Sequence, residues 1–195
     1  DEALFVARTI DQLSREGYSH KDFAVLYRTN AQSRTIEEAL LKSNIPYTMV
    51  GGTKFYSRKE IRDIIAYLNN ISYERVVNEP KRGVGPGTVD KIRNFAATQE
   101  ISLLDASANI MLSPVKGKAA QAVYEFGNLI LDLRDRLDDY SVTELVELVL
   151  KKTGYSAALA AQATLESQAR IENIEEFLSV TKNFDENPDN PADET

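Results

Sequence analysis

The order of apolar and polar positions in the first third of the chain alternates between helix and strand patterns. Apolar residues recur every three or four positions over 3–16, which predicts an amphipathic helix that ends at Gly17. Residues 23–27 form a nearly unbroken apolar run, typical of a strand buried on both faces. The elements expected next are a helix over 31–43 capped by Asn30, a strand over 47–50, and a helix from Arg58 to about Leu68.

This alternation predicts parallel α/β structure for residues 1–68. Two strands alone do not make a stable sheet. The chain also begins with Asp1 rather than with methionine. We therefore expect residues 1–68 to be part of an α/β domain that is completed elsewhere in a larger protein.

The remaining two thirds of the chain carry helical patterns without strand signals. Helices are expected over 72–78, over 89–99, from Ser102, after Gly117, from a capping box at Ser141 to Gly154, and over 165–184. Residues 185–195 hold five acids, two prolines and no base, which is typical of a disordered linker. The predicted fold class is therefore mostly α: a partial α/β segment over 1–68, an all-helical domain over 69–184 and an acidic linker.

Composition narrows the function classes. The absence of cysteine excludes disulfides and thiolate metal sites, and the single histidine, His20, excludes a His-rich metal site and any Ser-His-Asp triad that does not use His20. The absence of cysteine and of an apolar run of about 20 residues favours a cytoplasmic protein with no membrane partner. The net charge of −7 is uneven. Residues 21–93 carry thirteen Lys/Arg against eight Asp/Glu, whereas 94–195 carry eight against eighteen, so a nucleic-acid footprint would lie in the first of these segments.

A glycine-rich turn between two expected helices is the most specific motif. Three glycines alternate over 83–87, just before a helix thought to be capped by Thr88, and Lys81, Arg82, Lys91 and Arg93 surround them. Glycine allows positive φ, here expected at Gly85, and close approach to a surface, while a helix N-terminus offers N–H groups to an anion. The pattern is similar to a helix-hairpin-helix turn that holds a DNA backbone. A plain glycine-rich connector is the alternative.

Two other groups of residues are candidates. Tyr27 and Arg28 follow an expected strand, where open α/β sheets place ligand residues. The alternative is a core tyrosine beside a solvated arginine. Lys54, Phe55 and Arg58 combine cations with an aromatic ring, a composition suited to single-stranded nucleic acid. The alternative is a helix docked by Phe55 with an exposed basic first turn.

Several segments together resemble the UvrD/Rep/PcrA type of superfamily 1 DNA helicases, nearest to the PcrA branch of Gram-positive bacteria. Residues 23–34 (FAVLYRTNAQSR) are similar to motif IV of these enzymes, and residues 45–63 are similar to the segment that follows it. Residues 75–85 resemble the turn that contacts duplex DNA, and residues 167–177 resemble a late helix of the family. The resemblance covers essentially the whole chain.

This resemblance implies part of an ATP-dependent 3′-to-5′ DNA translocase with subdomains 1A, 1B, 2A and 2B. Residues 1–68 would be the start of the RecA-like subdomain 2A, and 69–184 most of subdomain 2B. Tyr27 would stack on adenine, and Arg28 would be catalytic through its contact with the γ-phosphate. The residues expected to contact duplex DNA are Lys81, Arg82, Gly83, Val84, Gly85, Gly87, Thr88 and Lys91. The partners implied are duplex, forked and single-stranded DNA, the other subdomains and protein regulators.

The sequence departs from the family pattern in two respects. The Walker A loop, the Walker B acids and the ligands of Mg²⁺ are not among these residues, so we expect the chain alone not to hydrolyse ATP. The segment over residues 67–72 is also shorter than the acidic loop that joins subdomains 2A and 2B in the family. Two rival functions are a stand-alone DNA-binding module and a protein-interaction or autoinhibitory module, the latter favoured by the acidic second half. Motif IV argues against both, since neither needs an arginine for a γ-phosphate.

Overall fold

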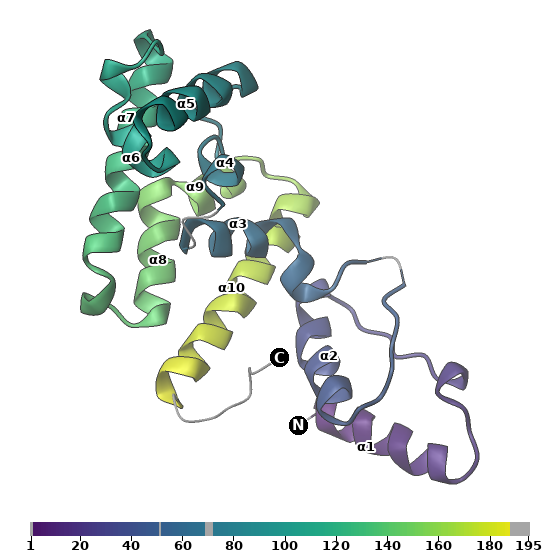
Figure 1. The fold of residues 1–195 in the computed structure, drawn as a ribbon. Helices are drawn as coiled ribbons and strands as arrows, with labels where there is room; N and C mark the ends of the chain where they lie inside the picture. Colours follow the sequence, from purple (N-terminus) through teal and green to yellow (C-terminus); the bar gives the residue numbers. More distant parts are fainter. Residues whose placement is uncertain (1, 51, 69–71, 188–195) are drawn as a thin grey trace. The chain divides into compact units, whose positions relative to one another are not determined.

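The computed structural model describes residues 2–50, 52–68 and 72–187, which form two compact units (Figure 1). The first unit is Asp1–Ile61 and the second Arg62–Thr195. The division falls inside a helix, seven residues before the boundary expected at residue 68. Residues 69–71, where the shortened loop was noted, lie outside the described part of the chain.

The first unit is built on two helices, α1 (Glu2–Arg15) and α2 (Ser33–Lys42), which pack against each other. Short 3₁₀ turns lie around them: η1 (His20–Asp22), η2 (Asn30–Gln32) and η3 (Phe55–Ser57). The core consists of Ala7 and Ile10 from α1, Leu40 from α2, and Ile45. Gly17 ends the first helix with a φ of 108°, as the sequence predicted.

The two strands predicted in this unit are wrong for the described residues, where no strand is assigned. In residues 23–27 the odd positions, Phe23 among them, face the helices, whereas Leu26 is 93% exposed, so the segment is covered on one face only. A strand is defined by backbone hydrogen bonds to a neighbour, and residues 24–27 make none to described residues. The apolar pattern is right, but among the described residues no layer covers the outer face of this segment and no strand pairs with it.

The second unit is helical throughout its described residues. Its helices are α4 (Tyr73–Val76), α5 (Pro86–Gln99), α6 (Leu103–Ala108), α7 (Gly117–Asp135), α8 (Val142–Thr153), α9 (Tyr155–Ala160) and α10 (Leu165–Glu186), together with the 3₁₀ turns η5 (Ile110–Leu112) and η6 (Leu137–Asp139). Helix α3 (Lys59–Leu68) begins in the first unit, and its later turns belong to this one.

Helix α7 contributes several residues to the core of the second unit. It packs against α6 and α8, α5 packs on α6, and α10 packs on α8 and α9 (Figure 1). The sequence predicts an apolar stripe of Val123, Phe126, Ile130, Leu133 and Leu137; the first four are buried, whereas Leu137 lies beyond the end of α7 and is 44% exposed. Gly127 lies on the same face, where a side chain would be only 2.8 Å from the Cβ of Ser107. The missing side chain therefore lets α6 approach α7 closely.

Most helix boundaries of this unit follow the capping signals in the sequence. The hydroxyl of Ser141 accepts the N–H of Glu144 at the start of α8, and Gly154 ends that helix with a φ of 72°. Helix α5 differs from expectation, because it begins at Pro86 with Gly85 as N-cap, and not after Thr88. The acidic segment also begins later than expected: Asp185 and Glu186 belong to α10, and residues 188–195 lie outside the described part.

Candidate nucleic-acid and nucleotide sites

The glycine-rich turn, defined here as residues 81–88, leads from the loop after α4 into the N-terminus of α5. Gly83 has a φ of 75°, a conformation that favours glycine. Gly85 does not have the positive φ expected for it; its φ is −85°, in the extended conformation of an N-cap. A side chain added at Gly83, Gly85 or Gly87 would meet no atom within 4 Å. This face of the turn is therefore open.

The outer surface of the turn offers hydrogen-bond donors and positive charge. The backbone N–H groups of Gly85 and Gly87 have no hydrogen-bond partner within the described chain. Lys81, which precedes them in the chain, and Lys91, in the second turn of α5, are exposed, and Thr88 is partly exposed. A helix N-terminus with free N–H groups carries a partial positive charge. The arrangement suits a backbone phosphate.

Arg82 does not extend into solvent as a free cation. Its guanidinium donates to the backbone oxygens of Val76 (3.1 Å), Glu79 (3.0 Å) and Thr153 (3.1 Å). It also donates to those of Val77 and Pro80 and to the hydroxyl of Tyr67. Thr153 is the last residue of α8, so the cation lies at the negative end of that helix. Arg82 thereby ties the base of the turn to α8.

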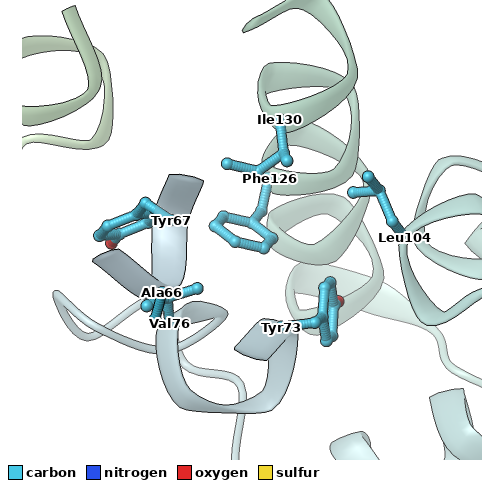
Figure 2. Close-up of a pocket in the computed structure, with 7 residues that line it drawn as sticks. All are labelled: Ala66, Tyr67, Tyr73, Val76, Leu104, Phe126 and Ile130. Atoms are coloured by element: carbon cyan, nitrogen blue, oxygen red, sulfur yellow. The ribbon is translucent and has the colours of Figure 1, made fainter. Parts of the chain in front are cut away.

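An aromatic cluster lies beneath Arg82. The guanidinium carbon is 5.1 Å from the ring centre of Phe126, and in Figure 2 this ring lies between Tyr67 and Tyr73. The Phe126 ring centre is 6.3 Å from that of Tyr67 and 5.5 Å from that of Tyr73. The pocket in Figure 2 has a free volume of about 10 Å³. That is about one water molecule, so this region is a packed support and not a ligand pocket.

Two residues predicted to contact DNA, Val84 and Arg82, make contacts within the second unit instead. Val84 is 2% exposed, so its side chain anchors the turn in the core. Arg82 is occupied by backbone oxygens, as described above. Among the side chains predicted to contact DNA, this leaves Lys81, Thr88 and Lys91 facing solvent. Arg93, which the sequence placed near the turn, is paired with Glu74 at 2.8 Å and with Asp90.

The nucleotide candidates lie in the first unit. The side chain of Arg28 is exposed and makes no ion pair or hydrogen bond with described residues. Its backbone is fixed, because the side-chain oxygen of Gln32 accepts the N–H groups of Arg28 (3.0 Å) and Thr29 (3.1 Å). Tyr27 is half-buried, and its hydroxyl donates to the sulfur of Met49. The structure thus presents a free guanidinium on a held backbone, while the neighbouring Tyr27 ring is turned partly inward toward Met49.

The three candidates for single-strand contact are placed differently from one another. Phe55 is 1% exposed, and the guanidinium of Arg58 lies 5.2 Å from its ring centre and donates to Ser33 at 2.6 Å. A base cannot stack on a ring buried in this way. Lys54 remains exposed, with its ammonium 5.4 Å from the ring of Tyr47. The alternative, a segment docked by Phe55, describes the structure better, and here Arg58 is buried with it.

The contact of Arg58 belongs to a buried polar network in the first unit. Ser33 donates to Glu37 at 2.8 Å, and the hydroxyl of Tyr47 donates to the same carboxylate at 3.1 Å. Burial, the charge of Glu37 and this hydrogen bond raise the pKa of Tyr47 to about 12. Tyr47 is therefore a neutral donor at physiological pH. The network fixes η3 on α2 and leaves no group free for a ligand.

Sequence reasoning did not find the two residues that hold these sites in place. One is Gln32, and the other is Asn78, whose side-chain oxygen accepts two backbone N–H groups of the glycine-rich turn. Asparagine and glutamine are ordinary loop and cap residues, so their type alone carries no signal. Within the described residues no group of acids and histidine could hold a metal ion. The helices described there include none long and apolar enough to cross a membrane.

Comparison with known proteins places the chain in a family. A model described as the UvrD-like helicase C-terminal domain matches residues 1–195. The chain therefore belongs to the UvrD-like helicase C-terminal domain family, as its motifs indicated. Among its relatives is the ATP-dependent DNA helicase PcrA of Staphylococcus aureus, 46% identical over 194 residues, or 96% of this chain. The proteins of the same name from Leuconostoc citreum and Staphylococcus epidermidis are 48% and 43% identical, over 98% and 96% of the chain. The chain spans 27% of the length of each.

Proposed function

We propose that this chain is the part of an ATP-dependent 3′-to-5′ DNA helicase that contacts duplex DNA ahead of the fork and supplies one half of the ATP site. The second unit would be most of subdomain 2B and the first unit the start of subdomain 2A. Subdomains 1A and 1B and the rest of 2A would be its partners within the complete enzyme.

The observation that carries the DNA-binding part is the open face of the glycine-rich turn. It combines the unpartnered N–H groups of Gly85 and Gly87 with the exposed ammonium groups of Lys81 and Lys91. Backbone N–H groups at a helix N-terminus and lysine ammonium groups bind phosphate oxygens, a contact that carries no sequence information, so binding should be independent of sequence. The acidic remainder of the unit repels DNA and confines contact to this turn.

The nucleotide part is supported by the free guanidinium of Arg28 and the ring of Tyr27. Both fit a nucleotide, because a planar guanidinium matches phosphate oxygens and an aromatic ring stacks on a base. ATP would supply the phosphoryl group whose transfer to water drives the enzyme. The cradle for the phosphates and Mg²⁺ would come from subdomain 1A. The unpaired outer side of residues 24–27 is consistent with a RecA-like sheet completed by the rest of 2A.

A titration by nuclear magnetic resonance tests the DNA-binding part. The 195-residue chain is labelled with ¹⁵N and titrated with a short duplex, a fork and a single strand of matched length. We expect the duplex and the fork to shift the amide signals of Gly83, Gly85, Gly87 and Thr88, with smaller changes elsewhere. Shifts confined to other surfaces, or none with duplex at concentrations that saturate the single strand, would overturn the assignment.

A further inference from the structure

Asn78 occupies a special place in the loop after α4. Its side-chain oxygen accepts the backbone N–H of Arg82 at 2.8 Å and that of Val84 at 3.1 Å. One oxygen can accept two N–H groups that are two positions apart only if the chain curves around it. The residue between them is Gly83, whose φ of 75° supplies this curvature.

The same two residues are anchored by their side chains on the inner side. The guanidinium of Arg82 is held by backbone oxygens, including that of Thr153, and Val84 is buried. These anchors do not fix the path of the backbone between Arg82 and Val84. Each is made by side-chain atoms beyond the Cβ, and the backbone can still take other paths. The oxygen of Asn78 is the contact that fixes this path, and it lies just before the N-cap of α5 at Gly85.

We propose that Asn78 is the positioning residue of the DNA-binding turn. By holding the N–H groups of Arg82 and Val84 inward, it aims those of Gly85 and Gly87 outward at a phosphate. The inference rests on the proposed contact of this turn with duplex DNA. Asn78 itself does not touch the DNA; it lowers the cost of ordering the turn when a phosphate binds.

The experiment compares Asn78→Ala and Asn78→Asp with the unchanged chain. Amide hydrogen exchange is followed at Arg82 and Val84, and duplex affinity is followed by fluorescence anisotropy. We expect Asn78→Ala to speed exchange at both amides about tenfold, the loss that one hydrogen bond represents. Duplex affinity should fall several-fold, whereas the melting temperature should change little because the anchors of Arg82 and Val84 remain.

Asn78→Asp keeps an acceptor oxygen in the same place, so protection at both amides should return to that of the unchanged chain. This variant is judged by exchange alone, because its added charge repels phosphate. The matched control is Asn128→Ala on α7, which removes an exposed asparagine that donates only to the backbone oxygen of Tyr124. It should alter neither exchange at the turn nor affinity for DNA.

The outcomes separate this inference from the proposed function. Unchanged exchange at Arg82 and Val84 in Asn78→Ala would overturn the positioning role, even if duplex binding is strong. Faster exchange with unchanged affinity would overturn it also, because the turn would then bind without being held. If the unchanged chain does not bind duplex at all, the proposed function fails, and exchange alone then shows whether Asn78 holds the turn.

Discussion

At the residue scale, two carboxamide side chains have the same task in the two units. Gln32 accepts the N–H groups of Arg28 and Thr29, and Asn78 accepts those of Arg82 and Val84. In each case the oxygen fixes a short stretch of backbone beside a group proposed to meet phosphate. The cationic side chains differ, since Arg28 is free and Arg82 is held within the unit.

This difference separates Lys81 from Arg82, although the two are neighbours in sequence. Arg82→Ala should lower the free energy of unfolding by about 2–4 kcal/mol, because it removes hydrogen bonds from a charged group and leaves backbone oxygens without a donor. Arg82→Lys should not restore stability, because an ammonium cannot reach the same set of oxygens. Urea unfolding followed by helical circular dichroism measures both.

Lys81→Ala is the matched control for that experiment. It should change stability by less than about 0.5 kcal/mol, because the side chain is exposed. It should still weaken duplex binding, equally for unrelated sequences. Equal loss of stability in Lys81→Ala and Arg82→Ala would contradict the separate roles.

Arg28 is tested in the complete enzyme. A guanidinium placed at the γ-phosphate stabilises charge that develops as the phosphoryl group leaves, a contribution of about 10³-fold or more in comparable enzymes. Arg28→Ala and Arg28→Lys should therefore both lower kcat far more than they raise KM for ATP. Tyr27→Ala should mainly raise KM through lost stacking. Steady-state ATPase kinetics with saturating single-stranded DNA measure kcat and KM for these variants. A near-normal kcat in Arg28→Ala would show that Arg28 is not catalytic.

At the scale of elements, local sequence signals predicted many of the helix boundaries. They failed where the structure depends on contacts with distant parts of the chain. The capping box at Ser141 and the terminator Gly154 act within a few residues, and both predicted α8 correctly. The hydrogen bond of Arg82 to Thr153 joins positions 71 apart, which a pattern along the chain does not reveal. The strands failed for the same reason, because an apolar run becomes a strand only beside another backbone. Helix α9 was missed, since six residues carry too little periodicity.

The contact of α6 with α7 makes a prediction about Gly127. A Cβ there would lie 2.8 Å from the Cβ of Ser107 and 2.9 Å from the backbone nitrogen of Ala108, so α6 must move. Gly127→Ala should lower the free energy of unfolding by about 1–3 kcal/mol, despite the better helix propensity of alanine. Gly87→Ala, where nothing lies within 4 Å, is the control and should be neutral or slightly stabilising. Thermal unfolding of the two variants checks this, and a stable Gly127→Ala would show that the contact is loose.

The N-terminus of α8 depends on an acid from α10. The carboxylate of Asp185 accepts the N–H groups of Val142 (3.0 Å) and Thr143 (2.9 Å). Its slight burial acts to raise the pKa, but hydrogen bonds from Thr143, Val142 and Ser141 outweigh that effect and lower it. Because the folded pKa is below the unfolded value of about 3.9, this contribution is present above pH 4 and lost as the pH falls through the folded pKa.

Asp185→Asn should therefore cost stability at pH 7 and little once the carboxylate of the unchanged chain is protonated. Urea unfolding at pH 7 and at a second pH below the folded pKa of Asp185 measures the two differences. The control is Glu186→Gln, which changes an exposed acidic residue on the same helix. An equal cost of Asp185→Asn at both pH values would show that the carboxylate charge is not what caps α8.

At the scale of the whole molecule, an acidic chain presents a small cationic contact. The net charge is −7, whereas the glycine-rich turn and the first turns of α5 combine two exposed lysines, Lys81 and Lys91, with a helix N-terminus. Such a chain should bind DNA weakly, at one place and without regard to sequence. In the complete enzyme the affinity would come from several subdomains together, and this turn would add the duplex contact.

The salt dependence of duplex binding tests the central claim most directly. The affinity of the 195-residue chain is measured by fluorescence anisotropy across a range of salt concentrations, for two duplexes of unrelated sequence. We predict a shallow slope of log K against log salt, corresponding to about two or three phosphates at ~0.9 per contact, and the same for both duplexes. Lys81→Ala should reduce the slope by about one. Affinity that depends on base sequence, or a slope that Lys81→Ala leaves unchanged, would contradict the account.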